Sequence, residues 1–178
     1  METPLIICVV GESGSGKSYI VDYLEREHGV RMIQSRTTRP RRYPDENGHE
    51  FVSHEEFDTY PEKYMLAFTT FGGERYCCLI KDVTDDVMTY VIDERGLLYL
   101  KEHFSKEFNI FAIRIFAGEH ERITRVGKER VDRDKGMFTL DTDQFDSFLY
   151  NEYDNDSTYR KTDTIYSRIK TTCHIQDK

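Results

Sequence analysis

One segment near the N-terminus constrains the fold of this chain more than any other. The apolar run "LIICVV" at residues 5–10 is followed by the loop "GESGSGKS" at residues 11–18 and by "YIVDYLEREHG" at residues 19–29. A short apolar run without polar alternation is typical of a strand buried on both faces of a parallel sheet. Apolar residues of the third stretch fall at helical spacing, and Gly29 comes where a helix would end. The segment therefore predicts a strand, a glycine-rich loop and a helix in direct succession.

The loop also fits a phosphate-binding pattern, G-x-x-x-x-G-K-[ST], in the strand-to-helix context that this pattern requires. Its glycines let backbone N–H groups point inward around a phosphate chain, and the following helix adds its dipole. Lys17 is expected to reach the β- and γ-phosphates, and the Ser18 hydroxyl to meet Mg²⁺. A flexible glycine–serine turn is the alternative. The predicted nucleoside-triphosphate site consists of Gly11, Glu12, Ser13, Gly14, Ser15, Gly16, Lys17 and Ser18.

A second group of anion-binding residues follows at residues 35–42, "SRTTRPRR", where four arginines occur within eight residues. The whole chain is acidic, with 25 Lys and Arg against 33 Asp and Glu and a formal net charge of -8. Net negative charge argues against a general nucleic-acid binder, which needs a broad basic surface. Crowded arginines repel one another unless water or an anion lies among them, and the planar guanidinium fork suits phosphate. The stretch is therefore either a site for a small anion or a solvated basic loop.

Several features predict a cytoplasmic protein that does not enter a membrane. No apolar run approaches the roughly 18 residues that a membrane span needs. The N-terminus has no basic flank, so we do not expect a secretion signal. The histidines are scattered, and the cysteines lack the paired spacing of metal ligands, so we expect reduced thiols. The four cysteines are Cys8, Cys77, Cys78 and Cys173.

Further along the chain, apolar runs alternate with helical patterns. The expected strands cover residues 30–35, 88–93, 109–116 and 145–152, and the expected helices cover about 95–104 and 157–169. Such alternation predicts an α/β fold with a parallel sheet covered on both faces. Residues 36–80 interrupt the rhythm, with a helix opened by Ser53 and a hairpin at Gly72-Gly73. We therefore expect an inserted β-rich subdomain there.

The stretch "SRTTRPRRYPDENGHEFVSHEEF", following "GESGSGKS", resembles the guanylate kinase family. The pattern of that family is roughly S-x-T-T-R-x-P-R, followed by G-x-x-Y-x-F-V-[ST]-x-E-E-F. The resemblance is strong over residues 5–57, moderate around "VIDERG" and weak in the arginine-rich segment, and it extends to about Asn151. The short length is also similar to that of the nucleotide kinases carried by bacteriophages.

The resemblance implies an acceptor site for a nucleoside monophosphate. Ser35, Arg39 and Arg42 match the residues that bind the acceptor phosphate, and "GERYC" places Tyr76 where a tyrosine hydroxyl also contacts it. Asp93 in "VIDERG" matches an aspartate near the acceptor base. Packing in the core is the alternative for Tyr76, and capping of the following helix is the alternative for Asp93.

Two further arginines of the stretch, Arg36 and Arg41, occupy positions that the family leaves variable, so we expect them to be solvated.

The residues that read guanine in the family differ here. Counting back from Tyr76, Ala67 stands where the family has a glutamate, and Cys78 stands where it has a serine or threonine. The tyrosine of the G-x-x-Y-x-F-V segment is absent, and His49 is the nearest replacement. A site built to pair polar groups discriminates strongly, so these changes leave the acceptor base open.

The resemblance also implies a mobile lid that brings arginines over the transferring phosphoryl group. The segment "RITRVGKERVDR" supplies Arg125 and Arg130 as the expected catalytic arginines, with Arg122 and Arg133 as further candidates. On one helix, Arg122, Arg125 and Arg133 would share a face. An ordinary exposed helix balanced by acidic residues is the alternative. Asn151 resembles a residue near the donor adenine, and a plain loop asparagine is its alternative.

Taken with the resemblance, the sequence predicts a P-loop NTPase α/β fold of three layers. It comprises a central parallel sheet, an inserted β-rich acceptor-binding subdomain and a helical lid. We expect one nucleoside monophosphate kinase domain over residues 1–178. Its core covers about 1–35 and 81–178, its insert about 36–80 and its lid about 118–138.

The implied activity is ATP-dependent phosphorylation of a nucleoside monophosphate, with GMP or dGMP as the expected acceptor and Mg²⁺ as cofactor. A kinase for a different (deoxy)nucleotide or other small acceptor is one alternative. A non-catalytic guanylate-kinase-like binding module is another, although such modules tend to lose the glycine loop. A GTPase or ATPase switch is the third alternative. It would show an N-K-x-D guanine signature, which the sequence lacks, or hydrolyse nucleotide without an acceptor. The ribose preference and the oligomeric state stay open.

Overall fold

The glycine-rich loop follows the first strand of a parallel sheet in this computed structural model, which describes residues 3–46, 48–152, 154–173 and 175. The strand order is β6-β1-β7-β8, and every pairing in it is parallel. The strands are β1 (Leu5–Val10), β6 (Val87–Val91), β7 (Asn109–Phe116) and β8 (Ser147–Tyr150). The predicted strands at residues 5–10, 88–93, 109–116 and 145–152 are therefore confirmed, to within a few residues at their ends.

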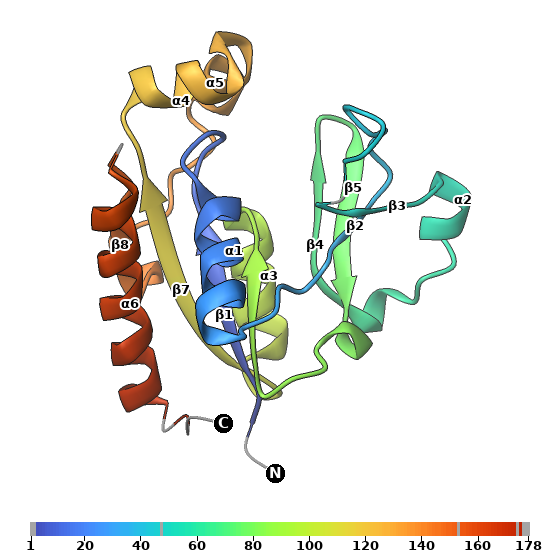
Figure 1. Ribbon diagram of the computed structural model, residues 1–178. Coiled ribbons are helices and arrows are strands. Elements are labelled where there is room, and N and C mark those ends of the chain that lie inside the picture. The colour runs from blue at the N-terminus through green and yellow to red at the C-terminus, as the bar shows by residue number, and fades with distance from the viewer. Residues whose placement is uncertain (1–2, 47, 153, 174, 176–178) are drawn as a thin grey trace.

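Helices cover both faces of this sheet (Figure 1). Helices α1 (Lys17–His28) and α6 (Asn155–Thr172) lie on one face, and α3 (Glu94–Phe104) lies on the other. Alternate residues of β1 enter two separate cores: Ile7 packs with the residues of α1 and α6, whereas Ile6 packs with those of α3. Every residue of β1 is buried, which explains why its sequence shows no polar alternation.

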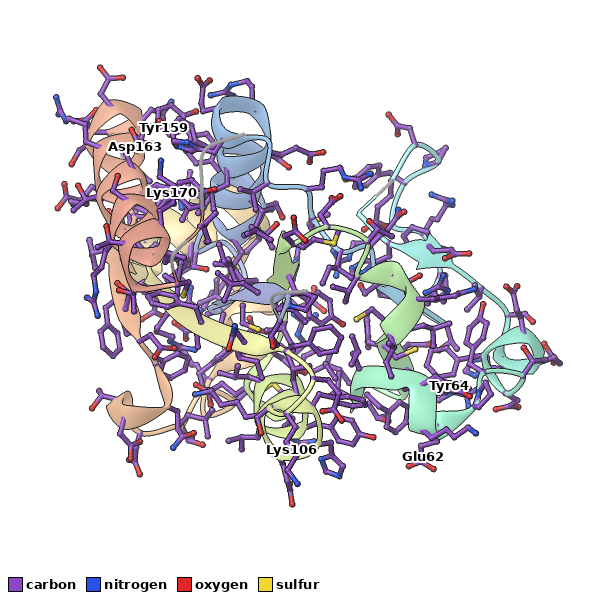
Figure 2. The ribbon with its side chains drawn as sticks, turned by 90° about the horizontal axis from the view of Figure 1, so that it is seen from below. Glu62, Tyr64, Lys106, Tyr159, Asp163 and Lys170 are labelled. Carbon is purple, nitrogen blue, oxygen red and sulfur yellow. The ribbon has the colours of Figure 1, made fainter. Side chains whose placement is uncertain are left out.

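Aromatic stacking joins α1 to α6. The rings of Tyr23 and Tyr159 stack with their centroids 4.0 Å apart, and the Tyr23 hydroxyl donates a hydrogen bond of 2.9 Å to Asp163. Figure 2 shows Tyr159 and Asp163 on α6, on the side near α1. Helix α1 ends at Gly29, whose φ of 67° is in the left-handed region and whose N–H caps the helix, as its position in the sequence predicts.

A second sheet stands beside the first (Figure 1), and all of its strands lie between residues 36 and 80. Its order is β3-β2-β5-β4, with β2 (Arg36–Thr37), β3 (Glu50–Phe51), β4 (Met65–Phe71) and β5 (Glu74–Leu79). Gly72 and Gly73 join β4 to β5 with φ angles of 60° and 84°, the positive pair that a tight hairpin turn requires. Helix α2 (His54–Phe57) begins at Ser53, whose side chain accepts the Glu56 N–H at 3.0 Å, as predicted.

The arginine-rich segment that is expected to form the lid, at about residues 118–138, forms two short helices rather than one. Helices α4 (Glu119–Val126) and α5 (Lys128–Asp134) meet at Gly127, whose φ of 84° interrupts the helical backbone. Both lie near the glycine-rich loop (Figure 1). The helical content of this segment is therefore confirmed, but a single helix with three arginines on one face is not. Short 3-10 turns occupy Glu62–Tyr64, Ile80–Asp82 and Thr142–Gln144.

The prediction of a strand at residues 30–35 is wrong. The chain makes an isolated bridge from Met32 to Thr89, and the Ile33 N–H donates to the Thr89 carbonyl at 2.7 Å. After Ile33 the chain leaves the parallel sheet and enters the second sheet at Arg36. The apolar pattern already ends at Ile33, so the remaining polar residues could not fill a central strand.

Within the part of the chain that the structure describes, no helix combines the length and apolar character needed to cross a membrane.

Candidate active site

A cavity of about 190 Å³ lies between the glycine-rich loop and the second sheet. Four parts of the chain line it, represented by Lys17 of the loop, Tyr76 of β5, Asp93 before α3 and Asp134 of α5. The strand-to-helix connections of a parallel sheet meet at the carboxyl edge of the sheet, where ligands of open α/β folds bind. The cavity therefore lies between the glycine-rich loop and Ser35, the first residue of the arginine stretch.

The glycine-rich loop has the backbone that its sequence predicts. Gly14 and Gly16 have φ angles of 79° and 96°, which side chains rarely adopt. A Cβ at Gly16 would also collide with the Asn151 side chain. Asn151 is buried, and its Nδ2 donates to the Ser15 carbonyl at 2.9 Å while its Oδ1 accepts from the Thr158 hydroxyl at 3.1 Å. Asn151 therefore links the loop backbone at Ser15 to Thr158 of α6.

Lys17 lies inside the loop. Its Nζ donates to the Gly11 carbonyl at 2.6 Å and to the Glu12 carbonyl at 3.1 Å. Burial lowers the pKa of Lys17 to about 8, and the negative charge of Asp134 opposes that shift. Ser18 is exposed in the first turn of α1, so its hydroxyl is accessible to a cation carried by a bound triphosphate.

The arginines of α4 contact the glycine-rich loop from outside. Arg122 is 6% exposed; its Nε donates to the Ser13 carbonyl at 3.1 Å, and its Nη1 pairs with Glu12 at 2.8 Å. Arg125 donates from Nη1 to the Gly14 carbonyl at 2.8 Å. Both guanidinium groups therefore hold loop carbonyls in this arrangement.

One arginine of α5 reaches the cavity itself. Arg133 lines it and donates from Nη2 to the Ser13 hydroxyl at 3.1 Å. The Nε of Arg130 is buried and has no hydrogen-bond partner among the described residues. Burial lowers the pKa of Arg130, and the positive charges of Arg42 and Arg133 lower it further. An unpaired guanidinium nitrogen beside other cations favours an anion as its partner.

In the arginine stretch, Arg39 is held by Glu46, a residue that the sequence analysis did not single out. The guanidinium donates to the two carboxylate oxygens of Glu46 at 2.8 and 3.1 Å, and the Arg42 N–H donates to the same carboxylate at 2.7 Å. Glu46 is 5% exposed. The hydrogen bond from Arg39 is the largest cause that lowers the pKa of Glu46 to about 2, so this carboxylate stays ionised.

Ser35 and His49 lie side by side in the same wall. Ser35 Oγ and His49 Nδ1 share a hydrogen bond of 2.6 Å, and the His49 ring meets the Tyr76 ring edge-on at 5.8 Å. Burial lowers the pKa of His49 to about 4, with a further contribution from the charge of Arg39. His49 is therefore neutral at pH 7.

Asp93 caps α3, which is the alternative role considered for it, and its place near an acceptor base stays a prediction. Its Oδ1 caps α3 by accepting the Gly96 N–H at 2.7 Å, and its Oδ2 accepts the Thr69 hydroxyl at 3.1 Å. Asp93 and Thr69 both line the cavity. Thr69 was not singled out from the sequence, although it lies directly across from Tyr76 in the β4–β5 pair.

Ala67 lies in an irregular part of β4, where the pairing register shifts between Leu66 and Thr69. Its φ of 54° is left-handed, which is unusual for a residue with a Cβ, and it lines the cavity. Cys78 is fully buried, with its Sγ 3.9 Å from the Leu66 carbonyl. All four cysteines are free thiols in the structure.

The expectation that Arg36 is solvated is wrong. Arg36 is buried, forms an ion pair with Asp82 and reaches Glu50 at 3.0 Å. It therefore ties the start of the second sheet to the turn after β5. Arg41 is exposed, lies over the Phe51 ring at 4.3 Å and donates to the Glu46 carbonyl.

The fold and this cavity define a P-loop α/β protein with a second sheet that faces the loop. No family model and no curated protein matches the chain. Among solved structures, guanylate kinase from Anaplasma phagocytophilum matches over 97% of this chain and 90% of that chain, with a TM-score of 0.66 and 20% sequence identity. This chain therefore has the guanylate kinase fold, and the predicted fold class is confirmed.

Proposed function

We propose that the protein transfers the terminal phosphoryl group of ATP to a nucleoside monophosphate. The observation that carries this proposal is the clustering of guanidinium groups from two separate elements around Arg130, next to the cavity that Arg133 lines. Arg39 and Arg42 come from the stretch after β2, and Arg130 and Arg133 come from α5. Glu46 and Asp134 offset part of this positive charge, and the buried Nε of Arg130 has no partner among the described residues, so the cluster favours an anion such as phosphate. The glycine-rich loop beside it supplies the site for a triphosphate.

The donor would bind along the glycine-rich loop. Loop N–H groups and Lys17 would hold its phosphates, and Arg122, Arg125 and Asn151 would keep the loop in shape through its carbonyls. Mg²⁺ supplies charge neutralisation on the phosphates when it is bound. The described residues contain no cluster of three metal-ligating side chains. An ion that arrives with the triphosphate needs none, and the exposed Ser18 hydroxyl is a suitable ligand for it.

The acceptor phosphate would bind among Arg39, Arg42, Ser35 and Tyr76. Phosphoryl transfer needs placement and charge neutralisation rather than a strong base, because a phosphate oxygen is already the nucleophile. Arg130 and Arg133 would stabilise the charge on the moving group together with Lys17. The neutral His49 would hold the Ser35 hydroxyl without adding charge.

Guanine nucleotides are the first acceptors that we propose, GMP or dGMP. The similar solved structure is a guanylate kinase, and the phosphate-binding residues of the acceptor stretch match that family. Asp93 lines the cavity and could accept an N–H from the base.

A different nucleotide base is the second candidate. Ala67 brings no polar group to the cavity wall, and both oxygens of Asp93 already accept hydrogen bonds, from Gly96 and Thr69. A guanine would therefore find less pairing capacity than a free carboxylate provides, and a base with fewer N–H groups would lose less.

Release of ADP from ATP and Mg²⁺ against ribo- and deoxynucleoside monophosphates tests the proposal. We expect turnover with at least one monophosphate, and turnover with GMP or dGMP alone would support guanine reading. Turnover with another base would support the second candidate. Binding of ATP without turnover on the whole panel would contradict the proposed activity and favour a binding module or a non-nucleotide acceptor.

A further inference from the structure

Asp134 is the most buried carboxylate of the lid segment, and it contacts the donor loop directly. The residue is the last of α5 and is 3% exposed. Its Oδ2 accepts the Ser13 backbone N–H at 2.6 Å. Its Oδ1 accepts from Arg133 Nε at 3.1 Å and from Nη2 at 2.9 Å. Burial alone would raise the pKa of Asp134, but hydrogen bonds from Ser13 and Arg133 outweigh burial and hold that pKa below its usual range.

Arg133 completes a closed set of contacts. The same Nη2 that reaches Asp134 also donates to the Ser13 hydroxyl at 3.1 Å, and the guanidinium lies 4.8 Å from the centre of the Phe71 ring of β4. One arginine of α5 thus contacts the donor loop and the second sheet together. Oδ1 of Asp134 holds the Arg133 guanidinium in a defined orientation. Oδ2 of Asp134 accepts the hydrogen bond from the loop backbone at Ser13.

The other acidic residues of α5 have no comparable surroundings. Asp132 is exposed and pairs with Lys135 at 2.7 Å, an arrangement typical of a solvated helix surface. Glu129 is also exposed. A buried carboxylate that accepts a backbone N–H from a loop more than a hundred residues away is expensive to desolvate, so its contacts must be satisfied for α5 to stay in place.

We infer that Asp134 is a positioning residue: it couples α5 to the donor loop and orients Arg133 over the phosphates. This inference rests on the proposed function, because the group that Arg133 would serve is the transferring phosphoryl group. Asp134 would act through Arg133 and Ser13 and would not touch the substrate. Orientation of one charged group by another matters because misplacement by about 1 Å can cost on the order of 100-fold in rate.

The first test needs no activity. Amide exchange of Ser13, followed by NMR in wild type and in Asp134→Asn, reports whether the carboxylate protects that N–H. The asparagine keeps the shape, but its uncharged amide cannot replace both sets of contacts. We expect Ser13 exchange to accelerate at least ~10-fold in Asp134→Asn and to stay unchanged in Asp132→Asn, the matched control on the same helix. Equal exchange in wild type and Asp134→Asn would overturn the inference.

The second test is kinetic. Asp134→Asn is expected to lower kcat by roughly 10- to 100-fold with little change in the acceptor KM. Arg133→Ala combined with Asp134→Asn should be no slower than Arg133→Ala alone, because the aspartate acts through the arginine. Additive losses would overturn the inference, as would tighter ATP binding with an unchanged kcat, which would make Asp134 a competitor of phosphate.

The two tests separate failure of the inference from failure of the proposed function. If wild-type protein transfers phosphate to no monophosphate, the proposed function fails, and the Ser13 exchange experiment still decides whether Asp134 joins α5 to the loop. If wild type is active and Asp134→Asn matches Asp132→Asn in both measurements, the proposed function stands and the inference fails.

Discussion

Glu46 holds Arg39 through two hydrogen bonds, of 2.8 and 3.1 Å, in the segment between β2 and β3. The pair is nearly buried, and the same carboxylate also fixes the backbone of Arg42. An arginine held in this way presents its guanidinium in a defined orientation, so an incoming phosphate need not order a flexible side chain. The arginine stretch at residues 35–42 is therefore organised by a residue outside its own arginine cluster.

Arg39→Ala should weaken use of the acceptor more than use of ATP. Loss of a guanidinium that pairs with phosphate removes a charge-assisted hydrogen bond and leaves Glu46 buried without its partner. We expect kcat/KM for the acceptor to fall at least ~30-fold, with the ATP KM changed by less than about threefold. The matched control is Arg31→Ala, an exposed arginine that pairs with Asp85 away from the cavity. Unchanged monophosphate kinetics in Arg39→Ala would remove Arg39 from the acceptor site.

Glu46→Gln should raise the acceptor KM by about 10-fold with a smaller effect on kcat, because a neutral amide holds Arg39 less firmly. Asp45→Asn, at the exposed neighbouring position, is the control. The pKa of Glu46 adds a stability prediction. It falls from 4.5 to about 2 on folding, so ionised Glu46 stabilises the fold above pH 4.5, and that stabilisation is lost as the pH falls towards 2. Thermal unfolding of Glu46→Gln should show less acid sensitivity in this window than wild type.

The lowered pKa of His49 predicts a loss of stability in a second pH window. Burial and the charge of Arg39 lower its pKa from 6.5 to about 4, so the folded state disfavours the protonated ring. The fold therefore loses stability as the pH falls from about 6.5 to about 4, and the loss is complete below that range. In His49→Gln the fall in Tm across this window should be smaller, whereas His120→Gln, at an exposed position of α4, should behave as wild type. An identical fall in all three proteins would show that His49 does not titrate in this way.

Ala67→Gly should leave the free energy of unfolding unchanged or raise it by up to about 1 kcal/mol. Glycine relieves the left-handed strain at a φ of 54°, which offsets the greater freedom that it gives the unfolded chain. Ala112→Gly, at a fully buried position of β7 with ordinary strand geometry, should lower it by about 1 kcal/mol or more. Urea unfolding of the two variants measures the contrast, and an equal loss at both positions would contradict the strained geometry at Ala67.

The sequence predicts the glycine-rich loop and the two elements that flank it well because that information is local. The glycine-rich loop, the strand before it and the helix after it follow from one continuous segment, and Lys17 lies where the pattern places it. The hairpin at Gly72-Gly73 is equally local, because two adjacent glycines specify a tight turn.

The features that could not be predicted from the sequence depend on contacts between segments that are distant along the chain. Asp134 looks like one acid in a charge-balanced surface helix until α5 is placed against Ser13. Thr69 could not be recognised from the sequence because the irregular pairing in β4 changes which residue lies across from Tyr76. The break at Gly127 had a signal, a glycine inside a helical pattern, and it separates Arg122 and Arg125 from Arg133.

The measurement that tests the central claim most directly follows the phosphoryl group itself. ATP labelled at the γ-phosphate is incubated with the protein, Mg²⁺ and GMP, dGMP or another monophosphate, and the products are separated. The account predicts label in the corresponding nucleoside diphosphate, loss of that product in Lys17→Ala, and little label in free phosphate. Label that appears as free phosphate at the same rate with and without any monophosphate would contradict it, because the protein would then be a hydrolase with no acceptor site.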